Sequence, residues 1–221
     1  MGSEEEILDN TLISKGRLEA LVDGVFAFAM TLLVVSLNVP TIPKAEAAIE
    51  LPAYLAMMFP QFLSFLIAFF ILASLWIVHH EHFHFLSSVD KIVLWLNVLI
   101  LIFVVLVPFS TNLSGAYSHV PIAPLIFHAN MLILSCLFLV QWQYIIHRPT
   151  LLTGPIHPDR VMDAFMDRVP IIFAAVTGMA LVIFNAPFSS MYMYMIFPLL
   201  MRILMWQIRS KRTIKNIQSA S

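Results

Sequence analysis

A ten-residue stretch, WIVHHEHFHF at residues 76–85, carries side chains that could do metal chemistry. His80, Glu81 and His84 match the H-E-x-x-H pattern of helical zinc proteases. On a helix the two histidines lie at i and i+4 on one face and can bind zinc, while the glutamate beside them can serve as general base. By itself the pattern predicts a metalloprotease.

Chain order and motif length weigh against this prediction. Intramembrane zinc proteases take a third ligand from an Asp-Gly motif on a later helix, and the single Asp-Gly of this sequence, Asp23-Gly24, precedes the histidines. H-E-x-x-H fixes only three letters, so a histidine-rich helix end satisfies it readily by chance. We therefore expect no enzyme, no cofactor and no metal site, with Glu81, His82 and His84 clustered where their helix leaves the membrane. Incidental metal binding by the two histidines of the pattern remains an alternative.

The composition is typical of a membrane protein. Of the 221 residues, 60% are hydrophobic and 11% are charged, far from the balance of a soluble domain. The apolar residues fall into six blocks, each long enough to cross a hydrocarbon core of roughly 30 Å as a helix rising about 1.5 Å per residue. We therefore expect an all-α integral membrane protein that forms one domain over residues 1–221. Its six predicted transmembrane helices span residues 18–39, 55–84, 90–111, 122–147, 161–186 and 190–211.

Two prolines and the first apolar block refine this picture. Pro60 and Pro108 each lie inside a predicted helix, where proline kinks or stops the helix. The residues before Pro60 could form a short interfacial segment.

We expect no cleavable signal peptide, because the first block follows an acidic leader and is too long for a signal sequence. The single cysteine, Cys136, excludes an internal disulfide.

The distribution of basic residues predicts the orientation in the membrane. Lys44 alone lies on one side of the predicted spans. The other eleven lysines and arginines lie on the opposite side: Lys15, Arg17, Lys91, Arg148, Arg160, Arg168, Arg202, Arg209, Lys211, Arg212 and Lys215. The positive-inside rule then places both the N- and the C-terminus in the cytoplasm. We expect the basic tail to contact anionic lipid headgroups rather than nucleic acid.

Asp23 lies near the start of the first predicted helix. A carboxylate inside a membrane span is costly, so it should face protein or water. On the predicted orientation, Trp76, His79 and His80 lie at the same cytoplasmic depth. Asp23 could reach the interface or pair locally with Arg17. We favour the other interpretation, an interhelical polar network with His79 or His80.

Beyond Asp23 the same helix carries an apolar stripe. At spacings i, i+4, i+7 and i+11 it contains Phe28, Leu32, Val35 and Val39. Thr31 and Asn38 lie close beside it. Such a stripe usually faces lipid or packs against protein, so periodicity alone does not predict a pore.

Three motifs together resemble the transmembrane protein 175 potassium-channel family in its short prokaryotic form. They are Arg17 with DGVFA at 23–27, WIVHH at 76–80, and Asn97 with PFST at 108–111. The order and length of all six predicted helices are also similar. Two adjacent positions depart from the family pattern, because its Phe-Ser before the aspartate is Leu21-Val22 here.

The resemblance implies a function and a set of site residues. It implies a homotetramer in a prokaryotic inner membrane, with the first helix of each subunit around a central pore that passes potassium and other monovalent cations. Phe28 would form the hydrophobic constriction, Leu32 and Val35 the next pore layers, and Thr31 would contribute to selectivity. Arg17, Asp23, Trp76, His79 and His80 would form the polar network. The chain has no Thr-Val-Gly-Tyr-Gly filter, so we expect modest selectivity from side chains.

A second class of function stays open. A small secondary transporter could use Asp23 and the histidines as a proton site. Such a carrier would give slow flux that depends on a pH gradient, whereas a channel would give fast, voltage-driven flux.

Overall fold

The computed structural model describes residues 14–35, 37, 39–157, 161–162, 166, 169–204 and 207. Its elements are α2 (Lys15–Val35), α3 (Ala47–Met57), α4 (Phe59–Phe85), α5 (Lys91–Ala116), α6 (Ile122–Ile146), the 3-10 turn η1 (Pro149–Leu151), α8 (Val169–Ile183) and α9 (Pro187–Ser190). A further apolar helix spans Met193–Leu204. The predicted all-α membrane fold is confirmed.

Four of the helices, α2, α4, α5 and α6, are long and apolar enough to cross a membrane. They match the first four predicted spans. The last two predicted spans, 161–186 and 190–211, overlap α8 and the helix Met193–Leu204, and both include residues outside the described part of the chain. The count of six spans therefore stays a prediction. The basic tail from 209 onward also lies outside the described residues.

Prolines shape the helix ends differently from one another. Pro60 lies in the first turn of α4, and a separate helix, α3, precedes it, which agrees with the predicted short segment. α2 ends at Val35 rather than at 39, and Pro40 disfavours helical geometry in Val39, the residue before it. Pro108, by contrast, lies inside α5, which continues to Ala116. A proline within a membrane helix is tolerated where neighbouring polar side chains are at hand.

Such a side chain lies beside Pro108. The Asn130 amide of α6 donates to the Phe103 carbonyl at 3.3 Å and to the Ser110 hydroxyl at 3.2 Å. These contacts bring polar groups to the turn of α5 that lacks the proline N–H.

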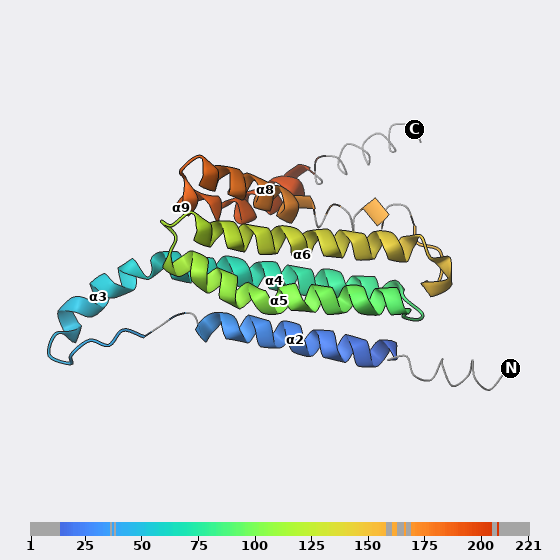
Figure 1. Cartoon of the computed structure of the whole chain (residues 1–221), viewed down its shortest axis with the longest axis horizontal. Helices are drawn as coiled ribbons and strands as arrows, with labels where there is room; N and C mark the ends of the chain where they lie inside the picture. The colour runs from blue at the N-terminus through green and yellow to red at the C-terminus, as the bar shows by residue number, and fades with distance from the viewer. Residues whose placement is uncertain are drawn as a thin grey trace, which may run out of the picture.

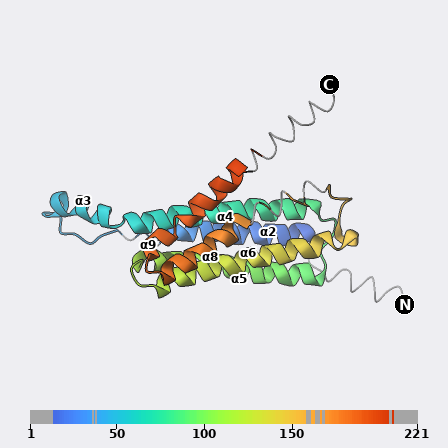
Figure 2. The ribbon, with the colours of Figure 1, turned by 90° about the horizontal axis from the view of Figure 1, so that it is seen from above.

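The four long helices run alongside one another in alternating directions, as Figures 1 and 2 show. α5 packs against α2, α4 and α6, and α6 packs against α8 on its other side. α2 therefore lies at one edge of the bundle and α8 at the opposite edge (Figure 1). α3 extends beyond the end of the bundle (Figures 1 and 2).

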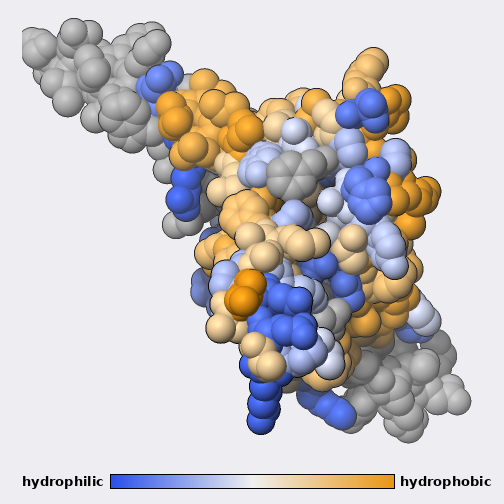
Figure 3. All heavy atoms as spheres, turned by 90° about the vertical axis from the view of Figure 1, so that its left-hand side faces the viewer, coloured by the Kyte–Doolittle hydropathy of each residue, from blue (hydrophilic) through white to orange (hydrophobic). Residues whose placement is uncertain are grey.

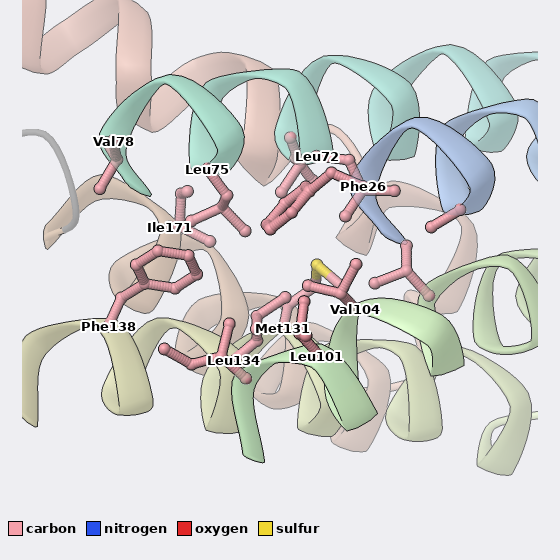
Figure 4. Packing of buried hydrophobic residues seen from close by; sticks show 14 of the residues in the cluster. Phe26, Leu72, Leu75, Val78, Leu101, Val104, Met131, Leu134, Phe138 and Ile171 are labelled. Carbon is pink, nitrogen blue, oxygen red and sulfur yellow. The ribbon is translucent and has the colours of Figure 1, made fainter. Parts of the chain in front are cut away.

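The core is apolar along the length of the bundle. Figure 4 shows Phe26 of α2 beside Leu72 and Leu75 of α4, with Val104 of α5 and Phe138 of α6 close by. The flanks also carry large apolar side chains, which is what lipid favours on an outer surface. Figure 3 views the end of the bundle, where hydrophilic residues gather between hydrophobic flanks.

A buried polar cluster joins α6 to the last helices. His128 is fully buried; its Nε2 lies 2.8 Å from the Ser190 hydroxyl and its Nδ1 lies 2.9 Å from the Tyr194 hydroxyl. Ser190 donates its own proton to the Pro187 carbonyl, so it accepts from His128 Nε2. Both nitrogens of the imidazole therefore have a hydrogen-bond partner.

Gly178 of α8 leaves the room that this ring needs. A Cβ at this position would lie 2.4 Å from His128 Cε1 and 2.7 Å from Nδ1. We expect Gly178→Ala to force the ring from its two hydrogen bonds and to lower the free energy of unfolding by about 1–3 kcal/mol, as overpacked cores do. Thermal unfolding in detergent measures this loss.

Gly16→Ala is the matched control for Gly178→Ala. Gly16 lies in α2, and a Cβ added to it would meet nothing within 4 Å, so alanine should be neutral or slightly stabilising there. Equal melting temperatures for the two variants would contradict a tight fit around His128.

Candidate pore helix and polar network

α2 has two faces with different surroundings. Its buried residues are Leu18, Val22, Phe26, Ala29 and Leu33, and they recur every three or four positions on the face that packs against α4 and α5. Within an apolar stretch of 18 residues, 28% of α2 is buried, compared with 33% of α5, 44% of α4 and 50% of α6. α2 therefore presents an open face in the isolated subunit.

The four predicted pore positions lie off the packed face. Phe28 is 60% exposed and Val35 is 69% exposed. Thr31 is exposed and Leu32 is half-buried, whereas Asn38, expected beside the same stripe, lies outside the described residues. The subunit thus leaves the predicted constriction, Phe28, without an intramolecular cover.

The Thr31 hydroxyl donates its proton within its own helix. Its Oγ1 donates to the Phe28 carbonyl at 2.8 Å, within the same helix. The hydroxyl lone pairs are left to accept from water or to contact a cation. This arrangement suits a group that replaces part of the hydration shell of an ion.

Asp23 is linked to the neighbouring helix through Trp76. The Trp76 indole Nε1 donates to Asp23 Oδ1 at 2.8 Å, and this bond joins α2 to α4. The predicted interhelical link is therefore present, but its partner is Trp76 rather than His79 or His80. His79 instead bonds to Asn97 of α5. Arg17 is exposed.

His79 is held by Asn97 of α5. The Asn97 Nδ2 donates to the Val93 carbonyl at 2.8 Å, which leaves its Oδ1 as the acceptor that lies 2.7 Å from His79 Nε2. His79 therefore donates from Nε2. Both side chains are buried, at 2% and 0% exposure, so this bond satisfies two groups that would be costly to bury alone.

Rings from three helices enclose His79. Its imidazole stacks on Phe83 at 4.3 Å between centroids, lies 6.3 Å from Phe138 in an edge contact, and lies 6.4 Å from Phe26. With Asn97, these residues come from α2, α4, α5 and α6. The imidazole is thus a meeting point of all four long helices, including the candidate pore helix.

The H-E-x-x-H residues are divided between two faces of α4. His80, Glu81 and His84 are exposed. His82, expected among them, is instead fully buried and stacks on Trp142 of α6 at 4.7 Å. Over the described residues, no group of three or more His, Cys, Asp or Glu side chains could hold a metal ion.

Three buried polar contacts had little signal in the sequence. The pairing of His79 with Asn97 joins two motif residues whose relation the spacing did not reveal. His82 lies in a histidine-rich run, and His128 lies alone in an apolar helix. The one available signal is periodicity. A polar residue at a helix position where the pattern predicts an apolar, core-facing residue is a candidate for burial.

A double-substitution cycle tests the His79–Asn97 bond. We expect Asn97→Leu and His79→Phe each to lower the free energy of unfolding by about 1–3 kcal/mol, because each leaves a buried polar group without its partner. The double variant should lose less than the sum of the two. Unfolding of the detergent-solubilised protein by denaturant measures all three.

Asn112→Leu serves as the control, because Asn112 lies on the same helix and is exposed. Its stability should stay close to that of the unmodified chain. Strict additivity of the two buried substitutions would contradict the bond.

The comparisons with known proteins agree on one family. The family model of TMEM175, described as an endosomal/lysosomal potassium channel, matches residues 17–108. A potassium channel of Streptomyces collinus is 32% identical over 59% of this chain and 64% of its own length, slightly less than two thirds. A potassium channel of a Chryseobacterium strain is 28% identical over 93% of this chain and 99% of its own length.

A solved structure supports the same relationship. The crystal structure of a lysosomal potassium-selective channel TMEM175 homologue from Chamaesiphon minutus superposes with a TM-score of 0.70 at 26% identity, over 85% of this chain and 97% of that one. The region matched by the family model includes the candidate pore helix and the polar network around His79. The motifs, the fold and these matches together show that the chain is similar to the TMEM175 family, whose model matches residues 17–108, fewer than half of the 221 residues.

Proposed function

We propose that this chain is the subunit of a potassium-permeable leak channel, a homotetramer in which four copies of α2 surround a central pore. The observation that carries the proposal is the two-faced character of α2. One face is packed into the subunit, while the opposite face leaves Phe28 60% exposed. Four such faces around an axis would cover one another and leave a narrow passage.

Phe28 would form the constriction of this passage. Four phenylalanine rings at one level make an apolar ring that can close by dewetting. Leu32 and Val35 continue the lining on the same stripe, with Val35 at 69% exposure in the single subunit. The channel would therefore gate through an apolar narrowing rather than through a charged one.

Selectivity would come from side chains at this level. Thr31 directs its proton to the Phe28 carbonyl, which leaves its oxygen free to contact a permeating cation. Four hydroxyls replace only part of the hydration shell. Potassium should therefore be favoured over sodium modestly, and other monovalent cations should also pass.

The surroundings of the channel follow from the same proposal. Six spans per subunit would place both termini in the cytoplasm of a prokaryotic cell, with the protein in the inner membrane and its basic residues near anionic lipid headgroups. Potassium is the permeant ion and no cofactor is needed. The similar proteins from Streptomyces, Chryseobacterium and Chamaesiphon are named as channels, which favours this function over an enzyme.

Potassium flux from liposomes tests the pore assignment. We expect the purified chain to release potassium and Phe28→Ala to raise the rate about tenfold, as would follow from lowering the barrier by about 1.4 kcal/mol. Phe70→Ala is the matched control, because Phe70 of α4 is also exposed, at 69%. This control should leave the rate unchanged.

Ion substitution separates the channel from its alternatives. Sodium should pass more slowly than potassium, and the large cation N-methyl-D-glucamine should be excluded. Flux that requires a pH gradient would favour the proton-coupled transporter. The pore assignment would be contradicted if neither the unmodified chain nor Phe28→Ala passed potassium while both remained folded and oligomeric.

A further inference from the structure

The first residue of α2 is tied to the end of α4. The Lys15 ammonium donates to the Leu86 carbonyl at 2.7 Å, across 71 positions in the chain. Leu86 is the residue that caps the C-terminus of α4. A cation is favoured at this end of a helix, where the backbone carbonyls carry partial negative charge. The tie therefore joins the base of the candidate pore helix to a fixed point of the bundle.

Leu86 is itself held by a second segment, which follows η1. Leu86 and Leu152 form an antiparallel β-bridge. The Ser87 amide donates to the Leu151 carbonyl at 2.8 Å, and the Thr153 amide donates to the Phe85 carbonyl at 2.9 Å. We call residues 85–87 together with residues 151–153 the clasp. Leu86 is fully buried within it.

The polar ties of α2 lie near one end of the helix. Lys15 bonds to Leu86, and Asp23 accepts from Trp76. Both bonds reach α4 or its cap. The buried side chains of α2 farther along, Phe26, Ala29 and Leu33, are apolar. Apolar packing is non-directional, so the hydrogen bonds of Lys15 and Asp23 specify where the base of α2 lies against α4.

We propose that Lys15 is a positioning residue for the pore: through the clasp it holds the base of α2 against α4 and away from the channel axis. This inference rests on the proposed tetramer. Exposed Phe28 stripes from four subunits gain by closing over one another, since apolar surface leaves water. The tie opposes that movement from the packed side of each helix. Without it, α2 leans toward the axis and the constriction spends more time closed.

Single-channel recording of Lys15→Met in planar bilayers tests the proposal. We expect the open probability to fall about fivefold, the factor that corresponds to about 1 kcal/mol. The conductance of an open channel and the potassium-to-sodium preference should stay unchanged, because Lys15 does not contact the permeant ion. Lys15→Arg retains a cationic donor and should restore most of the open probability.

Lys91→Met controls for charge. Lys91 is exposed at the start of α5, next to the clasp end of the bundle, so this variant removes the same charge without removing the tie. Its open probability should equal that of the unmodified channel. The proposal would be overturned if Lys15→Met and Lys91→Met had equal effects or if neither had an effect. It would also be overturned if Lys15→Met raised the open probability.

The clasp offers an independent arm. Thr153→Pro removes the amide that donates to Phe85, whereas Thr153→Val loses the hydroxyl bond to the same carbonyl and keeps the amide bond. We expect the proline variant to lower the open probability as Lys15→Met does, and the valine variant to stay near the unmodified value. A proline variant that is folded, tetrameric and normally active would overturn the role of the clasp.

The unmodified channel distinguishes a failure of the tie from a failure of the pore. Suppose that the unmodified channel conducts and that Phe28→Ala accelerates flux, but that Lys15→Met has the same open probability as the unmodified channel. Lys15 is then not a positioning residue, and the pore assignment is retained. If the unmodified chain does not conduct at all, the proposed function itself fails.

Discussion

A buried imidazole at the centre of an apolar bundle is the constraint on which the arrangement of the four long helices depends. His79 cannot be left without a hydrogen-bond partner in this environment, and Asn97 supplies one at 2.7 Å. Asn97 is itself fixed by the Val93 carbonyl. This pair sets the rotation of α4 against α5, and the rings around His79 then bring in α2 and α6.

That rotation decides what α2 presents to the outside. Phe26 contacts His79 on the packed face, so Phe28, two residues later, must point well away from it. Trp76, one turn before His79 on α4, is placed to donate to Asp23. On the proposed arrangement, the polar network lies outside the pore and orients the helix that would line it. A change at His79 would reach the pore through helix rotation rather than through contact with an ion.

Several features of the fold could be predicted from the sequence because they depend on local rules. Apolar blocks of membrane-spanning length predicted the four long helices, and Pro60 predicted the break before α4. Pro108 did not end α5; the Asn130 amide of α6 donates to the Phe103 carbonyl in the turn that precedes the proline. Whether such support exists depends on a residue 22 positions away, which local rules do not see.

The partners of the polar residues were harder to predict. Trp76, His79 and His80 all lie at the depth of Asp23, and only the rotation of α4 decides which of them reaches it. His82 belongs to a histidine run that is typical of an exposed cluster, yet it stacks on Trp142 in the interior. His128 depends on Ser190 and Tyr194, which are more than 60 positions away. These choices follow from tertiary packing rather than from spacing along one helix.

Cysteine accessibility offers the sharpest test of whether α2 lines the pore. Cys136 is free and exposed, so it is first replaced by serine. Thr31→Cys is then compared with Phe70→Cys in that background while a cationic methanethiosulfonate reagent is added to conducting channels. If α2 lines the pore, potassium current is blocked irreversibly in the Thr31 variant and is unaffected in the Phe70 variant. Unaltered current through a Thr31→Cys channel whose thiol has demonstrably reacted would contradict this assignment.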